Sequence, residues 1–263
     1  MDVKTGFSAA LSRVLHKLLN AFGVEVRLLR NIKAAHAEQR RNREFEAWRL
    51  LQAHPFTFVL DVGANEGQFA AIARRLWPLA QVHSFEPLPD VFAALKKRFG
   101  HDPMVTMHNI GLSDEAGSRQ MHRSAFSPSS SLLPMAELHR REWPQSADHT
   151  DTDVRLERLD DWMHHATTGS VSPMLVKIDV QGFEMAVIDG GAKTLREADY
   201  VVLEVSFPEL YEGQPLFESI HDRMRELGFI YRGNVEQFSS KDHRLVLYAD
   251  AVFENLRKVA TNV

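Results

Sequence analysis

The chain has 263 residues, of which 44% are hydrophobic, and this length can bury the core of one α/β domain with an additional segment. It contains no cysteine, which excludes disulfides, thiolate metal sites and a cysteine nucleophile. The formal net charge of -4 gives no basic footprint of the kind that nucleic-acid binding needs, so we expect a small-molecule substrate and no nucleic acid.

The first 55 residues are predicted to form a helical extension. Between Phe7 and Phe22 apolar residues recur at steps of three and four, which places them on one face of a helix, and a second helix is predicted from Arg40 to Ala53. Residues 1–55 contain 10 Lys and Arg against 5 Asp and Glu. We expect this basic segment to pack on the domain as a lid or to join the subunits of a homodimer. A role at a membrane surface or toward an anionic substrate is the alternative.

Signals for export or membrane insertion are not seen in this segment. It lacks the uninterrupted apolar core and the cleavage site of a signal peptide. No run in the sequence approaches the roughly 20 apolar residues that a spanning helix requires. We therefore expect a soluble, cytoplasmic protein with no transmembrane segment.

Pro55 ends the helical pattern, and strand-like apolar runs then alternate with helical ones. This alternation predicts one domain, residues 56–263, built on a largely parallel sheet. The predicted strands are 56–62, 81–85, 105–109, 174–179, 200–205, 229–231 and 244–248, and the predicted helices are 68–77, 91–99, 184–196 and 217–227.

The segment from about residue 112 to residue 153 interrupts this alternation. It is rich in Ser, Pro, Asp and His, with a turn at Glu115–Gly117 that suggests a hairpin and a flexible stretch at Ser127–Ser131. Long polar loops above a sheet edge are where lids and binding residues accumulate. We expect an insertion over the active site that shapes acceptor specificity, with a disordered loop of no function as the alternative.

A nucleotide-type cofactor loop is predicted directly after the first strand. Residues 58–69 read FVLDVGANEGQF, so a buried strand meets Asp61 near its end and turns through Gly63 and Gly67 into a helix. Glycine there lets the backbone approach a ligand closely. The Gly-x-x-x-Gly spacing differs from the fingerprints for dinucleotides and nucleoside triphosphates, which favours a cofactor without phosphates. In the alternative interpretation Asp61 caps the helix and the glycines serve only the turn.

Polar residues also follow the next two strands. Glu86 ends the second strand, where a carboxylate can accept hydrogen bonds from both hydroxyls of a ribose. Asn109 ends the third strand, where its amide or the neighbouring backbone could contact an adenine edge. In the alternative interpretation, Glu86 is a solvated residue at the end of its strand, and Asn109 forms a turn before Gly111.

Charged residues are concentrated at the fourth and fifth predicted strands. Lys177 and Asp179 share one face of a buried strand, because side chains alternate along it, and Glu184 follows in the first turn of the next helix. Glu204 lies one strand further on. We expect these residues to converge, so that a carboxylate with a raised pKa removes a proton from the substrate. A divalent metal bound by Asp179 and Glu204 is a second hypothesis, a structural network with Lys177 is a third, and His243 is a minor candidate for the base.

Six segments between about residues 56 and 250 resemble the FkbM family of methyltransferases. They are Asp61–Gly67, Phe85–Pro87, Asn109–Asp114, Leu159–Trp162, Lys177–Glu184 and Leu203–Val205. The resemblance implies a Rossmann-like class I methyltransferase fold, with a seven-stranded, mostly parallel sheet and an antiparallel last strand. It also implies S-adenosylmethionine as methyl donor and O-methylation of a hydroxyl on a sugar, polysaccharide or natural product.

The cofactor-binding residues that we expect all lie in these segments. They are Asp61, Gly63, Ala64, Asn65, Gly67, Glu86, Pro87, Asn109, Ile110 and Asp179. The family usually has Glu where this chain has Gln181, which removes one carboxylate and weakens the case for a metal or a base at that position. Residues 1–55 lie outside the resemblance.

Two other classes of function share some of these features. An NAD(P)-dependent oxidoreductase would explain the glycine loop and Glu86, but the short-chain kind uses Tyr-x-x-x-Lys, and no Tyr at 200, 211, 231 or 248 is followed by Lys four positions later. A non-catalytic scaffold could retain a cofactor pocket. The acidic residues at three strand ends argue against that alternative.

Overall fold

The computed structural model describes residues 38–39, 42–166 and 171–259. The chain divides into two compact units, Met1–Glu46 and Ala47–Val263. The helix expected between Phe7 and Phe22 lies outside the described residues. The second expected helix corresponds to residues 42–48, and it tightens into a 3-10 turn, η1 (Arg49–Leu51), before Ala53.

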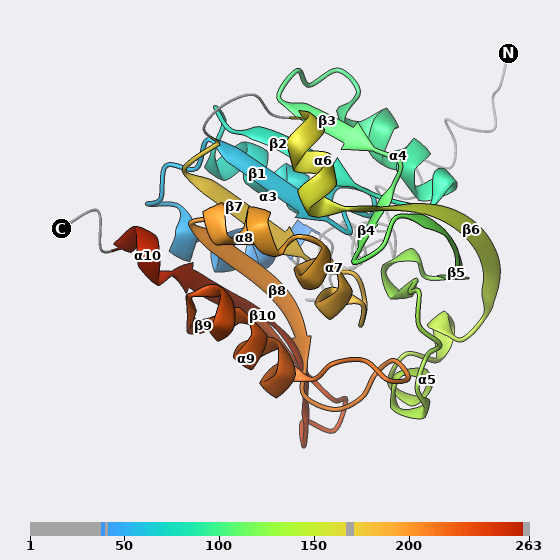
Figure 1. Ribbon diagram of the computed structural model, residues 1–263. Helices are drawn as coiled ribbons and strands as arrows, with labels where there is room; N and C mark the ends of the chain where they lie inside the picture. Colours follow the sequence, from blue (N-terminus) through green and yellow to red (C-terminus); the bar gives the residue numbers. More distant parts are fainter. Residues whose placement is uncertain (1–37, 40–41, 167–170, 260–263) are drawn as a thin grey trace, which may run out of the picture. The chain divides into compact units, whose positions relative to one another are not determined.

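A seven-stranded sheet runs through the second unit, in the order β3-β2-β1-β7-β8-β10-β9 (Figure 1). The strands from β3 to β8 in this order are parallel, whereas β10 is antiparallel to both of its neighbours. The predicted Rossmann-like sheet with an antiparallel last strand is therefore confirmed. The strands are β1 (Phe58–Val62), β2 (Gln81–Phe85), β3 (Val105–His108), β7 (Met174–Ile178), β8 (Tyr200–Ser206), β9 (Phe229–Ser239) and β10 (Val246–Asn255).

Helices cover both faces of this sheet, as the sequence of its central strands requires. Every residue of β1 and β7 is buried, which is typical of parallel strands packed on both sides. In Figure 1, α6 to α9 lie in front of the sheet and α3 lies behind it, and the front core includes Leu60, Val176 and Trp162. The helices are α3 (Gln68–Leu76), α4 (Pro89–Phe99), α6 (Leu159–Ala166), α7 (Glu184–Gly190), α8 (Ala192–Glu197), α9 (Phe217–Leu227) and α10 (Leu256–Val259).

The helix expected over residues 184–196 is two helices, so that prediction was wrong. The chain turns at Gly191, between α7 and α8. A Cβ on Gly190 would lie 1.9 Å from the carbonyl oxygen of Ser113, and one on Gly191 would lie 2.8 Å from Leu159. The two glycines thus let this turn pack directly on neighbouring backbone and side chains.

The insertion forms a second sheet of three strands, in the order β4-β6-β5. The strands are β4 (Gly111–Ser113), β5 (Gly117–Ser124) and β6 (His149–Arg158). The hairpin expected at Glu115–Gly117 is wrong, because β6 lies between β4 and β5 and pairs with both. A strand about 40 residues away along the chain competes successfully for pairing, which the local turn pattern could not indicate.

Between β5 and β6 the chain forms a loop of residues 125–148, which we call the cover loop. Its ends are joined by a hydrogen bond from the Ala125 N–H to the Asp148 carbonyl at 2.9 Å. It contains η2 (Ser127–Ser129), α5 (Glu137–Glu142) and η3 (Pro144–Ser146). The serine stretch that was expected to be flexible is turned and packed, since Ser129 and Ser131 are buried.

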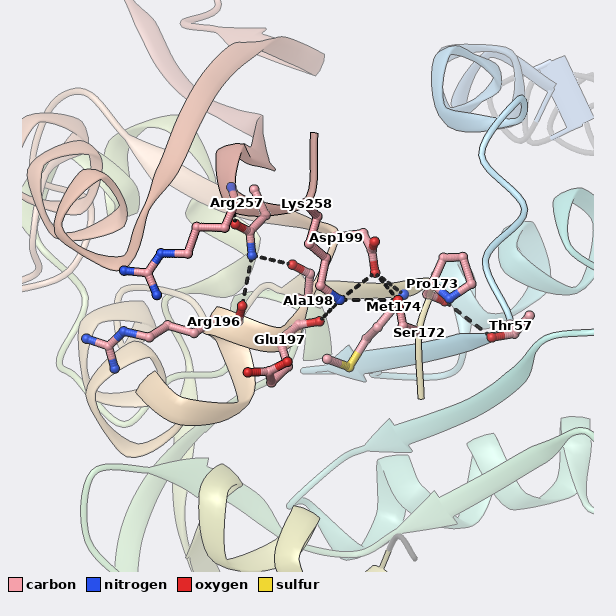
Figure 2. Close-up of polar contacts among 11 residues, drawn as sticks. Thr57, Ser172, Pro173, Met174, Arg196, Glu197, Ala198, Asp199, Arg257 and Lys258 are labelled. Carbon is pink, nitrogen blue, oxygen red and sulfur yellow. Dashed lines mark hydrogen bonds and ion pairs between the residues drawn. The ribbon is translucent and has the colours of Figure 1, made fainter. Parts of the chain in front are cut away.

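Polar contacts at the amino ends of β7 and β8 hold the C-terminal segment to the domain (Figure 2). Asn255 is fully buried, and its Nδ2 donates to the carbonyls of Arg196 at 2.9 Å and Ala198 at 2.8 Å. Asp199 accepts hydrogen bonds from the Met174 N–H at 2.7 Å and from Lys258 Nζ at 3.2 Å. These contacts connect β10 and α10 to the loop before β8.

Replacing Asn255 by Ala should lower the free energy of unfolding by about 2 kcal/mol, because two buried carbonyls lose their donor. Urea denaturation would measure the loss. Asn42→Ala, at an exposed position, is the control and should change the free energy of unfolding by less than about 0.5 kcal/mol. Equal effects of the two substitutions would contradict the role assigned to Asn255.

Candidate active site

The loop after β1 packs against the loop after β7. Gly63 and Gly67 have φ of 82° and 81°, in the left-handed region that favours glycine. A Cβ on Gly63 would lie 1.8 Å from the carbonyl oxygen of Asp179. The N–H groups of Gly63 and Ala64 donate to the Phe85 carbonyl, at 3.1 and 2.9 Å. The glycine loop is thus fixed between β2 and the Asp179 segment, which brings two predicted parts of the site together.

Asp61 is a fully buried carboxylate beneath this loop. Its Oδ2 accepts a hydrogen bond from Ser84 Oγ at 3.1 Å, and its Oδ1 has no hydrogen-bond partner among the described residues. Burial raises the pKa of Asp61 to about 6, although the Lys177 ammonium opposes the shift. An unsatisfied acceptor in this position fits a cationic or hydrogen-bonding ligand group.

Glu86 joins the loops that follow the first two strands. It is 4% exposed, and it accepts hydrogen bonds from the Asn65 N–H at 3.0 Å and from the Leu88 N–H at 2.9 Å. Burial raises the pKa of Glu86 to about 7. Asn109 Nδ2 donates to the carbonyls of Glu86 at 2.9 Å and Pro87 at 3.0 Å. Three predicted cofactor positions therefore form one connected edge, in which the Asn109 amide braces the Glu86 turn.

A second group of polar side chains connects β7, β8 and the cover loop. Lys177 Nζ donates to Asp179 Oδ2 at 2.8 Å. Gln181 Nε2 donates to Asp179 Oδ1 at 2.8 Å and to Glu204 Oε1 at 2.7 Å. The Tyr211 hydroxyl donates to Gln181 Oε1 at 2.7 Å. Two acceptors at one end of the Gln181 amide and a hydroxyl donor at the other fix its orientation.

The electrostatics of this group are dominated by carboxylates that are shielded from solvent. Burial and then the Asp179 and Asp250 carboxylates raise the pKa of Glu204 well above its usual value. Asp250 lies opposite Glu204 in the β8–β10 register. Burial alone would lower the pKa of Lys177, but the surrounding carboxylates, Asp179 first, raise it above the usual value. Lys177 is therefore a permanent cation beside Asp179, whose side chain is 27% exposed.

Glu184 and His243 do not join the bonded carboxylate network. Glu184 is 3% exposed, and its Oε1 accepts the N–H groups of Val180 and Gly182 at 3.1 Å each. Burial raises the pKa of Glu184 to about 7. This carboxylate holds the turn around Gln181, which has a φ of 55°. His243 lies exposed in the turn between β9 and β10, and its side chain forms no hydrogen bond with the network among the residues that the structure describes.

The arrangement argues against a divalent metal shared by Asp179 and Glu204. The Gln181 amide nitrogen lies within hydrogen-bond distance of both carboxylates, at 2.8 and 2.7 Å. An amide N–H₂ group is a donor and cannot ligate a cation. The residues present thus satisfy each other through hydrogen bonds at the place that a shared ion would need.

Sequence reasoning missed the residues that the cover loop and its surroundings bring to the site. Ser127 Oγ donates to Asn65 Oδ1 at 3.2 Å, and Ser131 Oγ donates to the Gln181 carbonyl at 2.6 Å. The Tyr211 hydroxyl also lies 3.2 Å from the Ser129 carbonyl. Burial and the nearby carboxylates raise the pKa of Tyr211 well above its usual value, so the hydroxyl keeps its proton. Serines in a polar insertion were the only available signal, and they indicated the region but not the contacts.

The predicted cofactor residues fit S-adenosylmethionine in part. The buried Glu86 carboxylate and the orphaned Asp61 Oδ1 are acceptors suited to ribose hydroxyls and to an amino group. Asn65, in the loop after β1, has a φ of 48°, and Ser127 of the cover loop contacts its side chain. Ile110, in contrast, is 8% exposed and belongs to the apolar core cluster. Its side chain therefore packs in the core and does not offer a polar contact to the cofactor.

The chain is similar to known proteins over the residues that form the two polar groups of the candidate site. The chain matches the methyltransferase FkbM domain over residues 61–231. The 2-O-methyltransferase NoeI of Sinorhizobium fredii is 32% identical over 176 residues, which are 64% of this chain and 71% of that protein. The 31-O-demethyl-FK506 methyltransferase FkbM of Streptomyces tacrolimicus is 28% identical over 201 residues, 68% of this chain and 75% of that protein.

A third relative is named for a hexuronic acid. The hexuronic acid methyltransferase AglP of Haloferax volcanii is 29% identical over 147 residues, which are 55% of this chain and 54% of that protein. The family match begins at Asp61 and includes Glu86, Asp179 and Glu204, so it contains both groups of polar residues described above. The chain belongs to the FkbM family of methyltransferases, and S-adenosylmethionine is the methyl donor that this membership implies.

Proposed function

We propose that this methyltransferase transfers the methyl group of S-adenosylmethionine to a hydroxyl oxygen of a saccharide or a natural product. The names of two relatives specify methylation on oxygen, and a third relative acts on a hexuronic acid. The observation that carries the proposal is the pairing of two polar groups at adjacent strand ends. Asp61 and Glu86 form one group, and the Asp179–Gln181–Glu204 network forms the other.

We assign Asp61 and Glu86 to the donor side of the site. Glu86 would accept hydrogen bonds from the ribose hydroxyls, and Asp61 would face the amino group. The sulfonium of the bound donor supplies an activated methyl group. The close packing of Gly63 on the Asp179 carbonyl fixes the donor loop relative to the acceptor side, so the protein's main contribution is alignment.

We assign Asp179 to the acceptor side as the base that receives the hydroxyl proton. It is the partly exposed carboxylate of the network, and Lys177 and Gln181 hold one of its oxygens each. Glu204 lies beyond Gln181, and its raised pKa favours the protonated form. Glu184 positions the turn that carries Gln181. A carboxylate base of this kind typically contributes about 100-fold or more to the rate.

The cover loop is our candidate for acceptor specificity. It contacts the donor side through Ser127 and the acceptor side through Ser131. A division into an extension of residues 1–55 and a catalytic domain of residues 56–263, a homodimer, and a cytoplasmic location also remain predictions. Among the described residues, no helix combines the length and the apolar character needed to cross a membrane.

Calorimetric titration of S-adenosylmethionine and, separately, NADH would test the donor. We expect micromolar binding of S-adenosylmethionine. The dissociation constant should be about 5- to 150-fold higher for Glu86→Ala, because this variant loses a charged hydrogen-bond acceptor. Glu66→Ala, at an exposed position in the same loop, should bind as the unmodified chain does. Binding of NADH alone, or of neither compound, would contradict the proposed donor site.

A further inference from the structure

The outer face of the small sheet carries two histidines and an aspartate that the candidate active site does not use. His122 on β5 lies directly opposite Asp151 on β6, and His149 precedes Asp151 by two residues and so lies on the same face. The opposite face of these strands holds Met121 and Val154, which belong to a buried apolar cluster. The three polar side chains are thus presented toward solvent by a paired and anchored scaffold.

The nitrogen and oxygen atoms of these three side chains are separated by distances that suit ligands of one small cation. His122 Nδ1 lies 2.8 Å from Asp151 Oδ1, and His149 Nε2 lies 4.0 Å from the same oxygen. All three atoms lie within 4.8 Å of one another. Ligands at about 2.0–2.2 Å from a tetrahedral ion are separated by about 3.4 Å, so the observed values bracket the spacing of a bound site. Small side-chain rotations would close the remaining difference.

The orientation of His149 supports a cation between these groups. Its Nδ1 lies 3.4 Å from the Ala147 carbonyl oxygen. This oxygen can accept a hydrogen bond only if Nδ1 carries the proton. The lone pair of the neutral ring is then on Nε2, the atom nearest to the Asp151 carboxylate. Both atoms can then donate an electron pair to a cation placed between them. A backbone carbonyl that fixes the tautomer in this way is typical of metal-binding histidines.

We propose that His122, His149 and Asp151 bind a divalent transition-metal ion of the zinc class. Two imidazoles and one carboxylate suit zinc, cobalt or nickel, whereas magnesium and calcium prefer oxygen ligands alone. His122 would ligate through Nδ1 with its proton on Nε2. The two imidazole rings already lie edge to face with centroids 5.1 Å apart. Three protein ligands leave one position of a tetrahedral ion open.

The place of this site in the fold indicates what the ion would do. His122 and His149 flank the two ends of the cover loop, whose closing hydrogen bond joins Ala125 and Asp148. The main chain of His122 also pairs with Ser131, the residue that contacts the Gln181 carbonyl. The ion would therefore fix the base of the cover loop without touching the reactants, so the site is independent of the proposed reaction.

Titration of the metal-free, untagged full chain with Co²⁺ would test the proposal. We expect saturation at one equivalent, the visible absorption of a tetrahedral cobalt centre, and displacement by Zn²⁺ but not by excess Mg²⁺. His149→Ala and Asp151→Asn should each weaken binding at least about tenfold. Both positions are exposed, with side chains 48% and 45% accessible, so the unfolding temperatures of the metal-free variants should match that of the unmodified chain.

The matched control removes another pair of neighbouring histidines. His164 and His165 are exposed on α6, with ring centroids 5.3 Å apart, and the double Ala variant should bind Co²⁺ as the unmodified chain does. The proposal is overturned by the absence of saturable binding, by equal binding to both ligand variants, or by equal competition from Mg²⁺. In the first case His122 and Asp151 form a hydrogen-bonded pair only.

Discussion

Asp179→Asn should lower the turnover number for the acceptor by about 100-fold or more, while the dissociation constant for S-adenosylmethionine changes by less than about threefold. The substitution keeps the size of the side chain, and its remaining oxygen can still accept a hydrogen bond from either Lys177 or Gln181. It removes the negative charge and with it the capacity to take the hydroxyl proton. Turnover measured at saturating donor, together with calorimetry, separates these two effects.

Asp161→Asn is the matched control for this prediction. Asp161 is on α6 with a side chain 64% exposed, and its ion pair with Arg158 is long, at 3.7 Å. Exposed pairs of this kind contribute little to stability. Turnover should therefore be unchanged. If Asp179→Asn retained full turnover, the proton would have to leave by another route, and Asp179 would be a structural partner of Lys177.

Glu86→Gln should change how the stability of the donor-free protein depends on pH. Folding raises the pKa of Glu86 from 4.5 to about 7, mainly through burial. Its contribution to stability is therefore fully present below about pH 4.5 and is lost as the pH rises through about 7. Gln cannot ionise, so the variant should gain about 3 kcal/mol relative to the unmodified chain between pH 4.5 and pH 8.

Urea denaturation at several pH values between 4.5 and 8 would measure this difference. Glu184, whose pKa is also raised by burial, contributes equally to both proteins and cancels in the comparison. The Asp61 carboxylate helps to raise the pKa of Glu86, so its interaction with Glu86 is part of the measured difference. Parallel stability curves would show that Glu86 titrates normally. We also expect Glu86→Gln to bind S-adenosylmethionine more weakly, so the same carboxylate would stabilise the complex and destabilise the empty protein.

The central part of the fold was predictable because its elements are local and strongly patterned. The strand Gln81–Phe85 and the helix Phe217–Leu227 have the predicted bounds. In contrast, β9 and β10 extend well beyond the expected 229–231 and 244–248. These long antiparallel strands are stabilised by pairing with each other and by the Phe238–Tyr248 stack, with centroids 4.5 Å apart. Such pairing depends on residues distant in sequence, so the local pattern ends too early.

The candidate site was predictable where its residues end strands. Asp61, Glu86 and Asp179 were identified because the carboxyl ends of parallel strands meet at one edge of the sheet. The contacts of Tyr211 were not, because they join residues 30 and 82 positions away in the sequence. Gln181 was treated as a missing carboxylate, whereas its amide connects Asp179 to Glu204. An amide donor between two acids can be recognised only once the strands are placed side by side.

The closed base of the cover loop has a practical consequence for engineering. Because residues 125 and 148 are already bonded to each other, the segment between them can be exchanged for that of a relative with little change in the distance that its ends must span. The Asp179 segment offers no such freedom, since Gly63 packs directly on its main chain. Chimeras designed for new acceptors should therefore be joined at residues 125 and 148. The loops that follow β1 and β7 should be left in place or transferred together.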